Sequence, residues 1–476
     1  MASFNPTSSI ASTSSVSTNQ KTNIVPLITL TLLFFMWGFI TCMNDILIPY
    51  LKKLFTLSYT QSMLVQLAFF GAYFIGSLVY FLISKFKGDP INKVGYKKGI
   101  IFGIMLSAIG CLLFIPASAT KLYGVFLIAL FVLGLGFTVL QITANAYVTL
   151  LGAPETASSR LNMTQAFNSL GTTLAPVIGG HVIFSIYKNA DGTLSDQATK
   201  IPYIVFAAIL VIVALVISKV KLPEFNQNND VTETSEPNDS MGALKFWNLK
   251  LGVLGIFFYV GAEVGIGSLM ISYIEHTLNM NEDAAKGFLA LYWGGAMAGR
   301  FMATFAFNGT INLVKRLIYM ILICGGIFVL LFYISKLQFE QMSFFALMMG
   351  VNIIGFLIGK SSASFSLSLF AIVNIALVAI GLMVPGALSV HLLLGIGLFN
   401  SIMFSNIYTL GVSGLGKYTS QGSSLLVMAI LGGAILPLLQ GWIADTYNLK
   451  VSYIIPVLCY VYIAFFGMVC NKRKIG

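Results

Sequence analysis

The amino-acid sequence predicts an all-α polytopic membrane protein, and three observations lead to this class. The 476 residues are 57% hydrophobic and 9% charged, whereas soluble domains carry about a quarter charged residues. Apolar runs of roughly 18 or more residues are long enough to cross the bilayer core as a helix, and they recur from residue 24 to the C-terminal region. The short alternating strands that build a membrane barrel do not occur in the sequence pattern.

The apolar runs predict six helices before a polar segment and eight after it. The segment KLPEFNQNNDVTETSEPNDS, residues 221–240, cannot bury a core and predicts a linker. The helices before it are predicted at 25–50, 60–84, 98–117, 122–150, 164–187 and 201–219. The helices after it are predicted at 249–274, 286–306, 313–334, 343–359, 364–384, 389–411, 424–443 and 451–470.

This order predicts two six-helix bundles joined by the linker. The eight helices of the second half exceed six by one pair, and residues 312–360 are predicted to form a helical hairpin inserted there. A re-entrant segment is the alternative, so 12–14 transmembrane helices are expected. The expected parts are a disordered cytoplasmic tail (1–23), an N-terminal bundle (24–220), a cytoplasmic linker (221–247), a C-terminal bundle (248–470) and a cytoplasmic tail (471–476).

The positive charge indicates the orientation of the helices rather than a nucleic-acid partner. The net charge is +11, and most Lys and Arg residues fall in loops on the side of the linker and of both termini, with Arg160 and Arg300 counted among them. Cytoplasmic loops carry an excess of Lys and Arg. We therefore expect both termini to be cytoplasmic.

Two acidic residues stand well inside apolar spans, Asp45 and Glu263. A charged acid near the bilayer centre costs roughly 2.5–3.5 kcal/mol on insertion scales, so it normally faces a cavity or a partner. Asp45 is therefore a candidate proton carrier, and the alternative is an acid solvated from outside at a helix end before Pro49. Glu263 could titrate, accept hydrogen bonds from hydroxyl groups, or pair with a neighbouring helix.

Amide side chains form pairs on two consecutive predicted helices. In LQITANAYV, Gln141 and Asn145 stand four apart and share one helix face, and in RLNMTQAFNSLG, Gln165 and Asn168 stand three apart. Amides offer both donors and acceptors, which suits a neutral polyol. The alternative is hydrogen bonding between helices, worth about 0.6 kcal/mol on average. Two pairs together favour a binding site. Aromatic rings that could stack on such a ligand are those of Trp37, Tyr73, Trp293 and Phe404.

No cofactor, metal, ATP or nucleic acid is expected, and no enzymatic activity. The three His residues are widely scattered, and the five Cys residues lie in apolar spans without metal-ligand spacing. The stretch GFLIGKSS (355–362) has three residues between its glycines, where a P-loop needs four. No nucleophile elbow is present either.

Seven stretches lie in order along both halves and carry a family resemblance. They are NDILIP (44–49), VGYKKG (94–99), LQITANAYVTLLG (140–152), RLNMTQAFNSLGTTLAPVIGG (160–180), YVGAEVGIGS (259–268), FNSIMFSNIYTLGVSGLG (399–416) and GSSLLVMAILGGAILPLLQGWIAD (422–445). Together they resemble the fucose–proton symporter family of the major facilitator superfamily, most closely its glucose/galactose transporter branch. The resemblance covers nearly all of residues 25–470. It implies the major facilitator fold, a central cavity between two bundles, alternating access and a bacterial inner-membrane location.

The resemblance also implies roles for individual residues. Asp45 matches the first-helix acid used in proton coupling, and Gln165 and Asn168 match substrate-cavity residues. Glu263 belongs to the glucose/galactose pattern.

Three positions depart from the fucose symporter pattern. Gln141 stands where a second acid is expected, and Phe404 stands where a tyrosine is expected. In the inner loop NKVGYKK, Asn92 replaces an acid, with Asp89 nearby. The departure at Gln141 weakens an assignment of fucose as substrate, and the departure at Asn92 concerns gating contacts that rely on the superfamily's acid in this loop.

The sequence therefore predicts a secondary active transporter that imports a neutral hexose, glucose or galactose, by proton symport. We expect a functional monomer in the lipid bilayer. The alternatives are an L-fucose or other deoxy-hexose symporter, a Na⁺-coupled hexose symporter, and a sugar sensor without transport. Asp45 and Glu263 are the candidates for proton coupling. The candidate substrate-binding residues are Asn44, Gln141, Asn145, Gln165, Asn168, Glu263 and Phe404.

Overall fold

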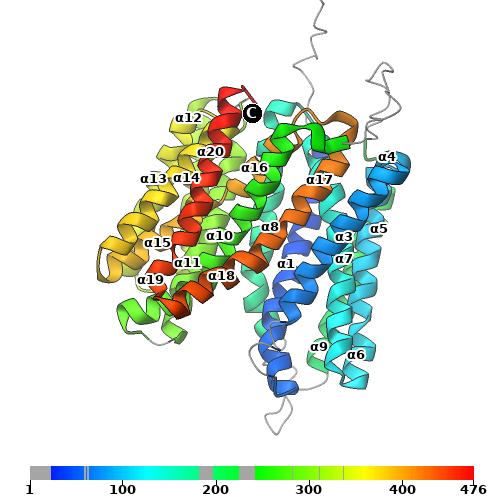
Figure 1. Ribbon diagram of the computed structural model, residues 1–476, viewed down its shortest axis with the longest axis horizontal. Helices are drawn as coiled ribbons and strands as arrows, with labels where there is room; N and C mark the ends of the chain where they lie inside the picture. The colour runs from blue at the N-terminus through cyan, green and yellow to red at the C-terminus, as the bar shows by residue number, and fades with distance from the viewer. Residues whose placement is uncertain are drawn as a thin grey trace, which may run out of the picture.

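The chain folds into a bundle of long helices (Figure 1). The computed structural model describes residues 23–57, 61, 64–181, 197–223, 242–280, 282–309, 311–335 and 337–475. All regular elements in these ranges are helical. Twelve of the described helical segments are long and apolar enough to cross a membrane, which confirms the predicted class.

The helices of the N-terminal half follow the predicted order. They are α1 (Ile24–Leu54), α3 (Leu64–Lys87), α4 (Pro90–Val94), α5 (Tyr96–Leu112), α6 (Phe114–Thr120), α7 (Tyr123–Leu150), α8 (Ala157–His181) and α9 (Gln197–Lys219). Helix α6 continues the direction of α5, and together they make one candidate span. The more polar α8 is not among the twelve candidate spans, yet its 25 residues suffice for a crossing at 1.5 Å per residue.

The helices of the C-terminal half begin after the linker. They are α10 (Trp247–Leu278), α11 (Glu282–Ala306), α12 (Leu313–Ser335), α13 (Phe339–Gly359), α14 (Ala363–Met383), α15 (Gly386–Asn400), α16 (Met403–Val412), α17 (Thr419–Met428), α18 (Gly432–Thr446), α19 (Leu449–Ser452) and α20 (Ile454–Lys472). Like α8, α11 is long but too polar to count among the twelve spans.

Helices α12 and α13 occupy the segment where the sequence predicts an inserted hairpin. They lie at the edge of the bundle (Figure 1), where α12 packs on α11 and α13 packs on α14 and α15. The outer face of α12 is apolar and exposed, as at Leu322 and Tyr333, which suits contact with lipid. The buried Asn352 amide of α13 donates to the Leu398 carbonyl oxygen of α15 over 3.2 Å. The pair is therefore tied to the bundle by a polar contact as well as by packing.

The two halves meet along α8 and α11. Near one end, the Ser159 hydroxyl donates to the Thr304 carbonyl oxygen over 2.5 Å, and further along the rings of Phe167 and Phe301 meet edge to face at 5.3 Å. More contacts between the halves lie at the same end of the molecule as Ser159: the Asn92 amide donates to the Lys417 carbonyl oxygen (2.9 Å), and the Ser423 hydroxyl donates to the Ile142 carbonyl oxygen (2.9 Å).

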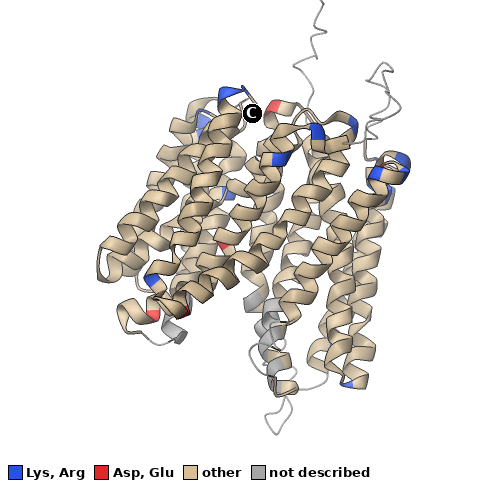
Figure 2. Ribbon diagram, in the orientation of Figure 1, with Lys and Arg blue, Asp and Glu red and all other residues tan. Residues whose placement is uncertain are grey.

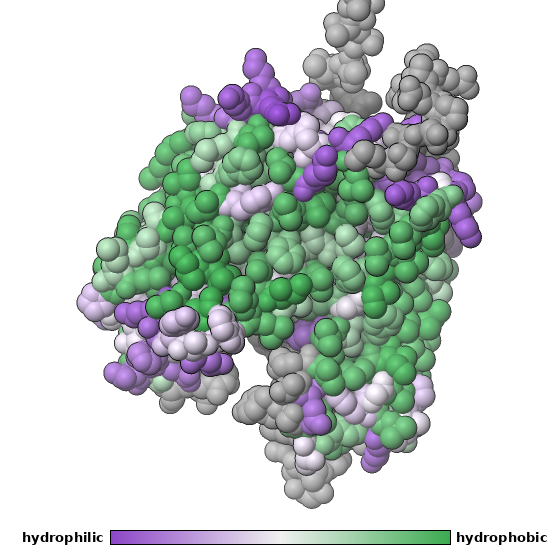
Figure 3. Space-filling view, in the orientation of Figure 1, coloured by the Kyte–Doolittle hydropathy of each residue, from purple (hydrophilic) through white to green (hydrophobic). Residues whose placement is uncertain are grey.

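The end of the molecule where these contacts join the two halves is called the joined end. Both ends of the described chain lie there. The Asn23 amide, just before α1, donates to the carbonyl oxygen of Leu151 after α7, and the Arg473 guanidinium lies 4.3 Å from the ring centre of Trp247. Most of the described Lys and Arg residues that Figure 2 shows gather here as well. At the opposite end the surface is indented between the two halves (Figure 3).

Arg160 is one of two arginines whose predicted placement in an inner loop is wrong. It is 3% exposed in the first turn of α8, and its guanidinium donates to the carbonyl oxygens of Val148 (3.1 Å) and Thr149 (2.7 Å). The last carbonyl groups of a helix have no partner within the helix. Arg160 therefore caps the C-terminal end of α7.

Candidate functional site

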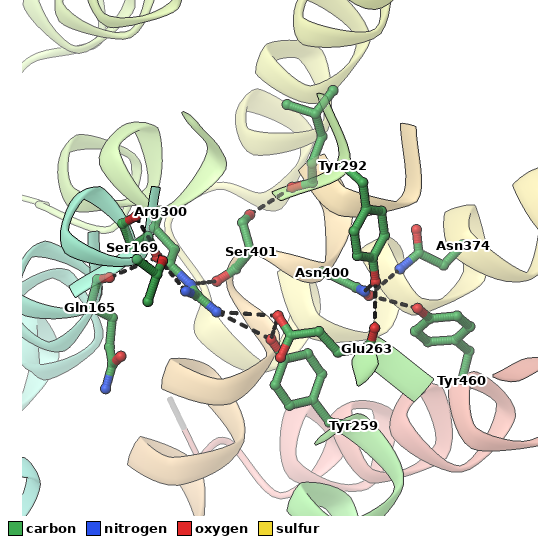
Figure 4. A network of polar contacts seen from close by, with 12 residues as sticks. Gln165, Ser169, Tyr259, Glu263, Tyr292, Arg300, Asn374, Asn400, Ser401 and Tyr460 are labelled. Carbon is green, nitrogen blue, oxygen red and sulfur yellow. Dashed lines mark hydrogen bonds and ion pairs between the residues drawn. The ribbon is translucent and has the colours of Figure 1, made fainter. Parts of the chain in front are cut away.

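A cluster of polar side chains lies inside the bundle where α8, α10 and α11 meet (Figure 4). Glu263 stands in the middle of α10. Its carboxylate Oε1 accepts a hydrogen bond from the Tyr259 hydroxyl at 2.6 Å and lies 3.4 Å from Nη2 of Arg300 in an ion pair. Both charged side chains are 13% exposed. The acid therefore has a cationic partner on the neighbouring helix.

Arg300 is the second arginine that the sequence analysis misplaced in an inner loop. It belongs to α11, six residues before that helix ends at Ala306. Its Nε donates to the Ser401 carbonyl oxygen at 3.2 Å, and its Nη1 donates to the Ser169 hydroxyl of α8. Arg300 thus links the C-terminal half to the N-terminal half. The predicted helix 286–306 already continued past this charge into the apolar run FMATFAF, so its bounds disagreed with the inner-loop assignment.

The predicted amides of the N-terminal half come together beside this cluster. Gln141, Asn145 and Gln165 are buried, and the Gln165 amide nitrogen donates to Asn145 Oδ1 across α7 and α8 at 3.4 Å. The Ser169 hydroxyl, one turn after Gln165, donates to the Gln165 carbonyl oxygen. The amides and the ion pair are therefore connected through Ser169.

Two amide atoms in this group are buried without a hydrogen-bond partner among the described residues. They are Gln141 Oε1 and Asn145 Nδ2, one acceptor and one donor. A buried polar atom without a hydrogen-bond partner costs about 1–3 kcal/mol of stability. A ligand that offers both a donor and an acceptor would satisfy these two atoms. Tyr73 and Trp37, predicted as ring-stacking candidates, are buried next to Gln141.

The remaining described candidates have different surroundings. Asn168 uses its amide nitrogen to donate to the Phe34 carbonyl oxygen of α1 at 3.0 Å, so part of this side chain serves helix packing. Phe404 stacks on Tyr408 with 6.1 Å between ring centres, and it lies 6.5 Å from the Tyr259 ring. It is thus a neighbour of the Glu263 cluster. Trp293 is 41% exposed.

Asn44 and Asp45 lie in α1, but their side chains fall outside the part of the structure that is described.

A second group of polar side chains, which the sequence analysis missed, contacts the backbone of Glu263. The Asn400 amide nitrogen donates to the Tyr292 hydroxyl at 3.0 Å, and Asn400 Oδ1 accepts from Asn374 (2.9 Å) and Tyr460 (2.8 Å). The Tyr292 hydroxyl in turn donates to the Glu263 carbonyl oxygen at 2.9 Å. Asn400 ends α15 just before a break at residues 401–402.

The site offers donors, acceptors and aromatic faces, with one ion pair at its centre. This combination fits a neutral molecule that carries several hydroxyl groups. Within the described ranges, no three His, Cys, Asp or Glu side chains lie close enough to one another to hold a metal ion.

Comparisons with known proteins establish the class of this protein. The sequence profile of the Major Facilitator Superfamily matches residues 28–383. A crystal structure of the Escherichia coli fucose–proton symporter superposes with a TM-score of 0.72 at 27% sequence identity, covering 94% of this chain and 99% of that chain. The chain belongs to the Major Facilitator Superfamily.

Within the superfamily, the chain is similar over nearly its whole length to two kinds of sugar transporter. The glucose/galactose transporter of Brucella abortus is 41% identical over 456 residues, covering 95% of this chain and 96% of that relative. The L-fucose-proton symporter of Escherichia coli is 29% identical over 467 residues, covering 94% and 93%.

Proposed function

We propose that the protein imports a neutral hexose, glucose or galactose, together with protons by alternating access. The observation that carries this proposal is the polar cluster at the junction of the two halves, in which Arg300 bonds to Ser169 and pairs with Glu263. A substrate bound here contacts both halves, so its binding can influence how they move relative to each other. The similarity to a glucose/galactose transporter at 41% identity supports a hexose as substrate.

The two halves contribute different chemistry to the proposed sugar site. Gln141, Asn145 and Gln165 supply amide donors and acceptors from the N-terminal half, and Glu263 supplies an ionised acceptor from the C-terminal half. Phe404 lies beside Tyr259 and offers an aromatic face. Hydrogen-bonding groups fix the orientation of a sugar, while ring faces cover its apolar side.

Asp45 is the proposed proton carrier. It lies in α1, which packs along α8, the helix that also carries Gln165. The neighbouring Asn44 is a proposed substrate ligand. Proton binding at Asp45 and sugar binding on α8 would then act on the same pair of packed helices.

The proposed location is the bacterial inner membrane, with the joined end of the molecule in the cytoplasm and the indented end outside. Lys and Arg residues gather at the joined end (Figure 2), as expected for a cytoplasmic face. We propose that the monomer is the functional unit, since each chain holds both halves of the site.

A counterflow panel tests the substrate. Proteoliposomes preloaded with unlabelled glucose, galactose, mannose or L-fucose are diluted into labelled glucose or labelled galactose, with and without Na⁺. The proposal predicts transient accumulation with internal glucose or galactose and no Na⁺ requirement. Counterflow only with L-fucose would favour the second candidate, a deoxy-hexose symporter, to which the 29% identity with the fucose symporter points. Counterflow that depends on Na⁺ would indicate that Na⁺ is the coupling ion in place of the proton. Hexose binding without counterflow would indicate a sensor.

A further inference from the structure

Arg300 and Glu263 form a buried pair whose geometry is asymmetric. The Tyr259 hydroxyl and Arg300 Nη2 both contact Oε1 of Glu263, at 2.6 and 3.4 Å. Arg300 Nη2 also donates to the Tyr259 hydroxyl oxygen at 3.3 Å. No described residue donates a hydrogen bond to Oε2 of Glu263, and the side chain is 13% exposed. One oxygen is therefore held by protein, and the other is available to a ligand.

The Arg300 guanidinium is itself fixed from three sides. Nε donates to the Ser401 carbonyl oxygen, Nη1 to the Ser169 hydroxyl, and Nη2 to the Tyr259–Glu263 pair. Arginine stays protonated in proteins even when it is buried. A fixed cation inside the membrane requires a fixed negative partner. If Glu263 took up a proton, Arg300 would remain as an uncompensated buried charge.

We propose that Arg300 is a positioning residue that keeps Glu263 ionised and directs its free oxygen to a sugar hydroxyl. Glu263 is then a hydroxyl acceptor and does not carry the transported proton. This inference rests on the proposed function, and it divides the two deep acids between the two tasks: Asp45 moves the proton and Glu263 recognises the sugar.

Ser169 extends the role of Arg300 to the other half of the site. Its hydroxyl accepts from Arg300 and donates to the Gln165 carbonyl oxygen. The guanidinium thus fixes Glu263 relative to the helix that carries Gln165. Arg300 therefore sets the spacing between the acceptor on α10 and the amides on α7 and α8.

The first test separates sugar recognition from proton coupling in reconstituted protein. Glu263→Gln is expected to weaken apparent hexose affinity in counterflow at least tenfold and to leave the number of protons per hexose unchanged in the remaining uptake. The double variant Glu263→Gln with Arg300→Gln removes both charges and leaves no uncompensated buried cation. It replaces the single variant in this test if the single variant does not fold, and the same result is expected. Glu275→Gln, on the same helix, is the matched control and should behave like the wild type.

The second test isolates the positioning role. Without its guanidinium partner, Glu263 takes up a proton as the pH falls, so Arg300→Gln should show hexose affinity that declines with acidification more steeply than in the wild type. Adding Glu263→Gln should remove this extra pH dependence, and Arg300→Lys should restore part of the affinity.

Two results would overturn the inference. One is uptake by Glu263→Gln that has unchanged hexose affinity but no proton movement, since Glu263 would then be the proton carrier. The other is a pH profile that Arg300→Gln leaves unchanged. If the wild type moved hexose without protons, the proposed symport would be wrong. The hexose affinities of the Glu263 and Arg300 variants at different pH values would still decide the role of Arg300.

Discussion

Asp89 orders the loop between α3 and α4, which contacts the C-terminal half at the joined end. Its Oδ1 accepts from the Ile91 amide at 2.9 Å, as the cap of α4, and from the Tyr80 hydroxyl at 2.7 Å. Asn92, on the same short helix, reaches the Lys417 carbonyl oxygen in the other half. Burial raises the pKa of the Asp89 carboxyl above its ordinary value, although the hydrogen bonds from Tyr80 and Ile91 oppose this shift. The folded protein therefore favours the protonated form more than the unfolded chain does.

The pH dependence of stability should reveal this buried acid. A group whose pKa is raised by folding contributes stability at low pH, and this contribution is lost as the pH rises above the ordinary range of an aspartate, near about 4. Asp89→Asn keeps an acceptor oxygen and removes the charge. We expect the melting temperature of the variant to fall less than that of the wild type between acid and neutral pH. Equal slopes would contradict this account, and Asp445→Asn, an exposed acid on α18, is the control.

Single residues also show what the sequence could and could not predict about the site. Glu263 was identified because an acid in an apolar span is rare. Its partner Arg300 was counted among the inner-loop cations, although the predicted helix 286–306 contains it and ends at Ala306, as α11 does. Tyr259 stands four residues before Glu263, a spacing that places both on one helix face. Ser169 had no such signal, because its role depends on a contact between the two halves.

At the scale of elements, the contact between α11 and α15 depends on glycine. A Cβ atom on Gly397 would lie 2.0 Å from the Tyr292 carbonyl oxygen, and one on Gly299 would lie 2.1 Å from the Ser401 hydroxyl oxygen. The GxxxG pattern of Gly295 and Gly299 predicts such close packing, and the structure confirms it. This contact places Arg300 against the break after α15.

Filling this contact should destabilise the protein. We expect Gly397→Ala to cost about 1–3 kcal/mol, as overpacking typically does, and to lower both the melting temperature and hexose counterflow. The control is Gly350→Ala on α13, where a Cβ atom would meet nothing within 4 Å. A Gly397→Ala variant as stable as this control would show that α11 and α15 do not pack as described.

The helices themselves were largely predictable, but the break in the α15–α16 span was not. Apolar length predicts a helix over residues 389–411, whereas the structure divides it at residues 401–402. No proline stands there. The break instead coincides with tertiary contacts, since the Asn400 side chain bonds to three other helices and the Ser401 carbonyl oxygen bonds to Arg300. Such contacts are visible only once the helices are assembled.

At the scale of the whole molecule, contacts between the halves are concentrated at the end that holds both ends of the described chain. The Ser158 hydroxyl of α8 lies 2.9 Å from the Thr409 hydroxyl of α16, and the opposite end is indented (Figure 3). Alternating access requires the joined end to open during each cycle. The contact of Ser158 with Thr409 must therefore break whenever the site opens at this end.

A reversible cross-link at this contact should stop transport. Ser158→Cys with Thr409→Cys, in a background where the half-buried Cys42 and Cys324 are replaced by Ser, places two thiols within disulfide reach. We expect oxidation to lower hexose counterflow at least tenfold and a reductant to restore it. The Ser158→Cys single variant should not respond to oxidation. Full counterflow in the fully cross-linked protein would exclude opening at this end.

The central claim is that one chain couples hexose entry to proton entry through Asp45. The direct measurement records labelled-hexose uptake and external pH together in proteoliposomes of the wild type and of Asp45→Asn. The account predicts that hexose makes the medium outside wild-type vesicles more alkaline, and that Asp45→Asn keeps counterflow but loses uphill uptake and the pH change. Uphill hexose uptake at full strength by Asp45→Asn would contradict it.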